Sequence, residues 1–83
     1  PNPFRHTLTI QLTLTEGTHK LQMSIYDVKG RLLVNEPETT ITGSSYQAIW
    51  NGDTRDGKPV SAGVYFIHLT VDGKSHIYRV VKL

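Results

Sequence analysis

Apolar side chains recur at every second position over several stretches of this chain, and this period constrains its fold more than any other feature. The stretch from residue 7 to 15 reads TLTIQLTLT, with leucine or isoleucine at every even position and threonine or glutamine at every odd one. A strand sends successive side chains to opposite faces of a sheet. The pattern therefore predicts a long β-strand with one buried face.

The same alternation predicts strands in three more places. Residues 21–26 and 46–50 alternate clearly, and residues 31–35 form a shorter run. The segment between them is weaker, because Pro37 cannot donate a ladder hydrogen bond. Residues 39–42 are therefore expected to form at most an edge strand.

The clearest local feature is a hairpin near the C-terminus. Residues 64–71 and 74–82 flank Asp72-Gly73, a pair suited to a two-residue type I′ turn, in which both central residues have positive φ. A two-residue turn fixes the register by counting. It places Leu69 opposite His76, Ile67 opposite Tyr78, Tyr65 opposite Val80, Phe66 opposite Arg79 and Val64 opposite Val81.

No stretch shows a sustained helical period, and 83 residues allow only one core. We therefore predict an all-β, immunoglobulin-like antiparallel β-sandwich of about seven strands, with residues 1–83 as a single domain. Because the chain begins with Pro1 and not Met, we expect it to be a domain excised from a larger protein, with the upstream part removed. The side chains expected to point inward are Leu8, Ile10, Leu12, Leu21, Met23, Ile25, Trp50, Tyr65, Ile67 and Leu69.

Composition argues against several classes of function. The chain has no cysteine, which excludes disulfides, thiol catalysis and cysteine-based zinc sites. Nine lysines and arginines against seven acids are scattered singly, whereas nucleic-acid binders concentrate cations against phosphates. No stretch approaches the ~20 apolar residues of a membrane span. We expect neither nucleic-acid binding nor a transmembrane segment.

Candidate metal and catalytic sites are weak. Asn51, Asp53 and Asp56 share a polar loop, but Arg55 stands where an EF-hand-type calcium loop needs an oxygen ligand. Zinc requires three or four converging ligands, and none of the four histidines converge in the predicted register. His68 and His76 are expected on opposite faces, and His6 and His19 in or beside loops. No serine lies in a nucleophile-elbow context. We expect no metal, no cofactor and no catalysis.

Turn chemistry and packing account for most of the remaining residues. Gly30, Gly52, Gly57 and Gly63 are expected at turns that need unusual backbone conformations rather than around a ligand. Trp50, Tyr46 and Tyr65 are expected to fill the core, because aromatic side chains bury the most area. Tyr26 and Phe66 fall on the polar faces of their strands. An exposed coplanar pair there would instead favour carbohydrate binding.

Several short motifs follow one another in a fixed order over almost the whole chain. They are Pro1-Asn2-Pro3-Phe4, IYDVKGR at 25–31, Gly43, Trp50-Asn51-Gly52, Asp56-Gly57-Lys58-Pro59-Val60, Gly63-Val64-Tyr65-Phe66 and Arg79-Val80-Val81. This ordered set resembles the C-terminal sorting domain of the type IX secretion system of Bacteroidetes. It is similar also to the immunoglobulin-like domain of the flagellar hook-capping protein. The chain departs from the family at Asn51, where an aspartate is frequent, and at Arg79, where lysine is frequent.

The resemblance implies a non-catalytic sorting and anchoring domain. Its partners would be the outer-membrane secretion machinery and an upstream cargo domain of the same chain, and the cargo would reach the medium or the outer-membrane surface through the periplasm. The alternatives are a carbohydrate-binding or spacer module of a secreted hydrolase and a structural domain of the hook-capping type. The secretion signal implied by the resemblance comprises Gly63, Val64, Tyr65, Arg79, Val80, Val81, Lys82 and Leu83.

Overall fold

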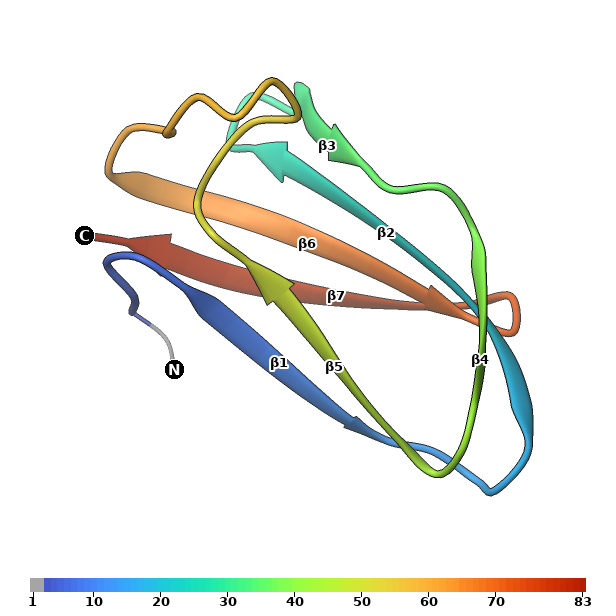
Figure 1. Cartoon of the computed structure of the whole chain (residues 1–83). Coiled ribbons are helices and arrows are strands. Elements are labelled where there is room, and N and C mark those ends of the chain that lie inside the picture. The colour runs from blue at the N-terminus through green and yellow to red at the C-terminus, as the bar shows by residue number, and fades with distance from the viewer. Residues whose placement is uncertain (1–2) are drawn as a thin grey trace.

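A computed structural model describes residues 3–83, and these residues form seven strands and no helix. Figure 1 shows the strands as arrows in two layers. Their bounds are β1 Leu8–Thr13, β2 Thr18–Asp27, β3 Leu32–Asn35, β4 Thr39–Thr42, β5 Ser45–Trp50, β6 Gly63–Val71 and β7 Lys74–Lys82. The predicted all-β sandwich is confirmed.

The two layers are unequal sheets made of antiparallel pairs. One sheet contains only β1 and β5, and the other has the order β3-β2-β6-β7, with β4 also paired to β2. The long strand β2 uses the same edge twice: its first half pairs with β4 and its second half with β3. Pro37 falls in the gap between β3 and β4, where no ladder hydrogen bond is required of it. The predicted edge strand at residues 39–42 is confirmed.

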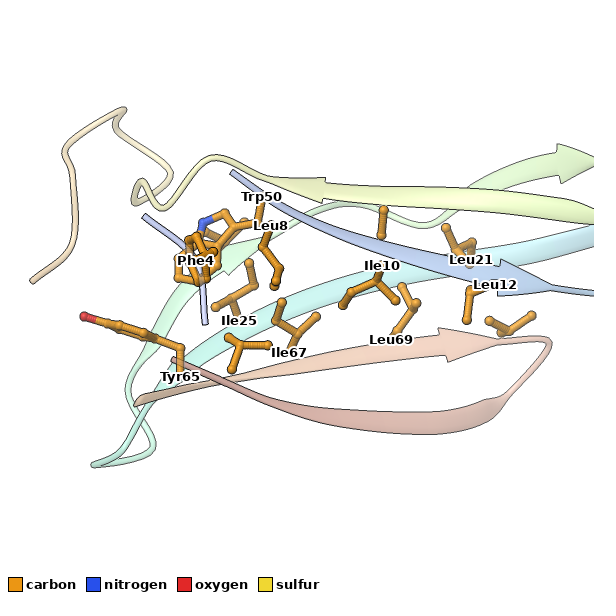
Figure 2. Close-up of a cluster of buried hydrophobic side chains, with 14 residues drawn as sticks. Phe4, Leu8, Ile10, Leu12, Leu21, Ile25, Trp50, Tyr65, Ile67 and Leu69 are labelled. Carbon is orange, nitrogen blue, oxygen red and sulfur yellow. The ribbon is translucent and has the colours of Figure 1, made fainter. Parts of the chain in front are cut away.

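The core lies between the two sheets, as the side chains in Figure 2 show. All the residues predicted to point inward are buried except Met23, which is half-buried. Met23 lines a groove of about 220 Å³ between β5 and the connection from β3 to β4, where the narrow sheet does not cover the wide one. The full buried set is Phe4, Leu8, Ile10, Leu12, Leu21, Ile25, Val34, Ala48, Trp50, Tyr65, Ile67, Leu69, Val71 and Val80.

The C-terminal hairpin has the predicted register throughout. Tyr65 lies opposite Val80, Phe66 opposite Arg79, and the other predicted pairs also form. Asp72 and Gly73 have φ of 50° and 82°, so both central residues of the turn occupy the left-handed region that a type I′ turn needs. The register places Tyr65, Ile67, Leu69 and Val71 on the buried face of β6.

Candidate recognition site at the open end of the hairpin

The two sequence segments implied as a secretion signal lie side by side in the structure. Gly63, Val64 and Tyr65 are paired with Lys82, Val81 and Val80, and Phe66 is paired with Arg79. The hairpin turn is at the far end of these strands, so the paired residues form its open end. One antiparallel ladder therefore brings the whole implied signal together, with Leu83 directly after it.

The N-terminal segment pairs with β7 at the open end of the hairpin. Phe4 forms a parallel bridge with Lys82 on the edge of β7 that β6 does not use. The Phe4 N–H donates to the Val81 carbonyl at 3.0 Å, and the Leu83 N–H donates to the Phe4 carbonyl at 2.8 Å. The beginning and the end of the described chain consequently lie at the same end of the molecule (Figure 1).

An aromatic cluster packs beneath the same end. The ring centroid of Trp50 lies 5.6 Å from that of Phe4 and 5.4 Å from that of Tyr65 (Figure 2). The Trp50 indole N–H donates to the Asp53 carbonyl at 2.8 Å, and the Tyr65 hydroxyl donates to the Ser61 carbonyl at 2.6 Å. Burial raises the pKa of the Tyr65 hydroxyl. The cluster joins β5, β6 and the N-terminal segment into one apolar unit.

Lys82 is a packing residue of this end rather than a loose tail. Its ammonium donates to the Val60 carbonyl at 2.7 Å, and the side chain is half-buried. The stem of Lys82 also lies against Gly52: a Cβ added there would approach Lys82 Cε to 3.2 Å. Gly52 has φ of 75°, which favours glycine independently. Lys82 thus holds the long connection between β5 and β6 against the last strand.

The implied signal residues divide into an inner and an outer group. Tyr65 and Val80 are buried, and Gly63 and Lys82 are half-buried. Val64 and Val81 alternate to the opposite face of the sheet, where Arg79 is exposed and Leu83 is 54% exposed. Val64 and Val81 are themselves half-buried, so the exposed residues of the implied signal are Arg79 and Leu83.

Aromatic residues of the adjacent strands lie beside the outer group on the same face of the sheet. Arg79 of β7, Phe66 of β6 and Tyr26 of β2 lie opposite one another in a single row. The Tyr26 ring packs against the His68 ring, with centroids 4.7 Å apart and planes at 51°. Tyr26 and Phe66 are both half-buried. Their expected placement on the outward face is confirmed, while Trp50 and Tyr65 are in the core and Tyr46 packs half-buried against it.

Backbone hydrogen bonds shape the polar loop that contains Asn51, Asp53 and Asp56. Val60 N–H donates to the Gly52 carbonyl, Thr54 N–H to Lys58, and Gly57 N–H to Thr54. All the glycines expected at turns have positive φ: Gly30, Gly52, Gly57 and Gly63. Within residues 3–83, no group of three or more His, Asp or Glu side chains is placed to hold a metal ion.

The histidines are placed as expected in part. His68 is paired with Ile77 on the outward face and His76 with Leu69 on the other, so the opposite orientation is confirmed. His6 lies before β1 and His19 is the second residue of β2, beside the connection from β1, as expected, but His19 is buried, at 8% exposure. Its side chain bonds to Asp72, which is distant in sequence, and sequence periodicity carries no signal for such a contact.

The sequence did not predict the packing roles of Phe4 and Lys82, which complete this end of the molecule. Phe4 is 4% exposed, yet it lies outside every alternating stretch. The contact of Lys82 with Val60 joins the last strand to an irregular loop. Only the position of Phe4 in the opening PNPF motif drew attention to it. Among the described residues, no helix is long and apolar enough to cross a membrane.

Solved structures share this fold. PorU from Porphyromonas gingivalis matches with a TM-score of 0.78 and 19% identity, over 100% of this chain and 9% of PorU. PorZ from the same organism, an essential bacterial surface component of the type IX secretion system, matches with a TM-score of 0.63 and 28% identity, over 100% of this chain and 11% of PorZ. FlgD from Pseudomonas aeruginosa matches with a TM-score of 0.61 and 20% identity, over 92% of this chain and 59% of FlgD. This chain therefore spans about a tenth of PorU and PorZ.

No curated protein matches the sequence closely. The sequence model of one family, described as "Secretion system C-terminal sorting domain", matches residues 1–83. That family is defined by sorting and not by catalysis, and it implies a protein that is secreted or displayed at the cell surface and that interacts with the type IX machinery. Since the match covers the whole chain, this protein domain belongs to the C-terminal sorting domain family of the type IX secretion system.

Proposed function

We propose that this chain is the C-terminal domain of a longer exported protein and that it directs the preceding cargo through the type IX secretion machinery. The machinery recognises the folded domain at the open end of the β6–β7 hairpin. The exposed residues Arg79 and Leu83 are read by the machinery together with the outward faces of Val64 and Val81, and Gly63, Tyr65, Val80 and Lys82 position them. The domain itself catalyses no reaction.

One observation supports this proposal most directly. The two implied signal segments form a single ladder, and the N-terminal segment is hydrogen-bonded to the end of the same strand through Phe4. A cargo joined ahead of Phe4 would therefore leave the domain beside the signal and not from the opposite pole. This arrangement keeps cargo and signal in one place during export.

The test is a fusion of a folded reporter protein ahead of the domain, expressed in a bacterium with a type IX system. We expect the intact fusion on the cell surface or in the medium. The variants Arg79→Glu and Leu83→Asp change exposed side chains, so we expect them to fold normally and to accumulate in the periplasm. Lys58→Glu makes the same charge change in the polar loop and should be exported like the intact fusion.

The result can contradict the proposal clearly. If the intact fusion is folded yet remains in the periplasm, the sorting role is wrong for this chain. A carbohydrate-binding or spacer module, or a structural domain of the hook-capping type, then takes its place. Thermal melts of the purified variants separate a lost signal from a lost fold.

A further inference from the structure

The outward face of the five-stranded sheet carries a patch that the core does not explain. One row across the sheet contains Leu32, Tyr26, Phe66 and Arg79, and the next row contains Ser24, His68 and Ile77. Leu32 is 51% exposed and Ile77 is 61% exposed. These residues come from four different strands, so the patch exists only in the folded domain.

The patch is apolar in its middle and is bordered by one cationic side chain, Arg79. Among the outward positions of β2, β6 and β7, which alternate with the buried ones, the other cationic residue is Lys20, two outward positions beyond Ser24. None of these outward positions within the described strands holds an aspartate or glutamate. The carboxylates at the strand ends are already engaged: Asp27 with Arg31 at 2.7 Å and Asp72 with His19 at 2.6 Å.

The size of the patch indicates a short-lived contact. Four strands about 4.8 Å apart span about 15 Å, so the patch covers a few hundred Å², which is in the range typical of functional surface patches. A stable interface buries roughly 800 Å² on each partner. A sorting domain that is recognised and then released needs an interface that buries less area than a stable one.

Charge and shape decide between the possible occupants. A second copy of the same face would offer no carboxylate to Arg79, because none of the outward positions within the described strands is acidic. A sugar ring stacks on an exposed aromatic face, whereas Tyr26 and Phe66 are half-buried and aliphatic Leu32 and Ile77 are exposed beside them. An apolar protein surface that carries carboxylates fits both the apolar middle of the patch and Arg79 at its border.

We infer that this outward face, centred on Tyr26, Phe66 and Ile77 and bordered by Arg79, docks an acidic surface of a partner protein during export. The inference rests on the proposed sorting function. It extends the recognised surface from the last strand to β2 and β3, whose residues lie more than forty positions earlier in the sequence. It also assigns the chemistry of the partner: carboxylates around an apolar centre.

The test uses the reporter fusion with two matched pairs of variants. Ile77→Ser removes an exposed isoleucine from the proposed face, and Ile49→Ser removes one that is 53% exposed on the other sheet. Arg79→Glu reverses a charge on the face, and Lys58→Glu reverses one outside it. We expect each face variant to lower the rate of export about tenfold and each control less than about twofold, in keeping with the loss of an interface anchor.

A charge series identifies the partner's chemistry. If carboxylates surround Arg79 in the complex, Arg79→Lys keeps most of the export, Arg79→Gln lowers it and Arg79→Glu lowers it furthest. Overproduction of the isolated domain in the periplasm should slow export of the intact fusion by competition. The isolated Ile77→Ser, Arg79→Glu double variant should not compete. Melting temperatures of all variants establish that they are folded.

Two failures are distinguishable. If the intact fusion is not exported, the proposed function is overturned and the docking inference falls with it. If the intact fusion is exported, Leu83→Asp is retained in the periplasm and Ile77→Ser is exported like the intact fusion, only the docking inference is overturned. Equal export of Arg79→Lys and Arg79→Glu would overturn the acidic character of the partner, and loss of export in Ile49→Ser alone would place the contact on the other sheet.

Discussion

The imidazole of His19 is bound to the carboxylate of Asp72, with His19 Nδ1 2.6 Å from Asp72 Oδ2. The other carboxylate oxygen of Asp72 accepts the Lys20 N–H at 2.8 Å, and the Asp72 N–H donates to the Lys20 carbonyl at 2.9 Å. Asp72 is the first residue of the hairpin turn. These contacts therefore attach the tip of the C-terminal hairpin to β2.

The contacts of the His19 side chain favour its charged form. Its second nitrogen, Nε2, lies 2.6 Å from the Thr15 carbonyl oxygen, which can only accept. Both nitrogens can donate only in the protonated ring. The hydrogen bond to Asp72, followed by that to Thr15, raises the pKa of His19, and the hydrogen bond from His19 lowers the pKa of Asp72. Glu16 also raises the pKa of His19, and Lys20 lowers that of Asp72.

The first prediction concerns the pH dependence of stability. The raised pKa of His19 gives stability that is complete below its ordinary value of 6.5 and is lost as the pH rises through the folded value. The lowered pKa of Asp72 gives stability that is complete above its ordinary value of 3.8 and is lost as the pH falls. Thermal melts should show this contribution at its largest between these pH values and a decrease above pH 6.5.

Two variants separate this pair from other titrating groups. His19→Gln should flatten the decline above pH 6.5 and lower the melting temperature at pH 5. His76→Gln removes an exposed histidine from β7, which β6 separates from β2, and is the matched control for the loss of a histidine. An unchanged profile in His19→Gln would show that another group causes the decline.

The second prediction concerns the centre of the core. Leu69 is fully buried, at 0% exposure, on β6. Leu69→Ala removes packed methyl groups and leaves a cavity, so we expect a loss of about 2–5 kcal/mol in the free energy of unfolding. Ile77→Ala on the exposed face should change it by less than about 0.5 kcal/mol. Urea unfolding measures both, and similar values for the two variants would contradict the assigned core.

The third prediction concerns the N-terminal segment. Phe4 is 4% exposed and packs on Trp50, although it precedes the first strand. Phe4→Ala should therefore cost about 3–5 kcal/mol, as for other buried aromatic residues. The half-buried Phe66 on the outward face is the matched control, and Phe66→Ala should cost clearly less. A negligible effect of Phe4→Ala on urea unfolding would show that the domain does not need its first residues.

The fourth prediction concerns the contact between the last strand and the β5–β6 connection. Lys82→Met keeps the stem and removes the hydrogen bond to the Val60 carbonyl, which should cost about 1 kcal/mol. For a domain of this size that lowers the melting temperature by about 4–8 °C. Gly52→Ala should also destabilise the domain, because φ is 75° there and the new methyl group meets Lys82 Cε. Equal melting temperatures for Lys82→Met and the parent would contradict a packing role for Lys82.

Much of this domain follows from local patterns in its sequence. The alternation between polar and apolar residues predicts β1, β2 and β5 most clearly, because a pleated strand exposes every second residue on the same face. Asp72-Gly73 fixes the register of the last hairpin, because a two-residue turn leaves no freedom in the pairing. That register alone places Gly63–Tyr65 beside Val80–Lys82 and sends Arg79 outward.

Only the tertiary structure shows the contacts that the alternation of polar and apolar residues does not predict. Phe4 packs in the core from an irregular segment, and Lys82 donates to a loop carbonyl. His19 contacts Asp72, which is distant in the sequence. The outward patch also arises only when β3, β2, β6 and β7 align. Alternation reports which face of a strand is buried, but not which strand becomes its neighbour. Strands that are far apart in the sequence become neighbours because two sheets pack over one core. Strand pairing is therefore a property of the whole fold.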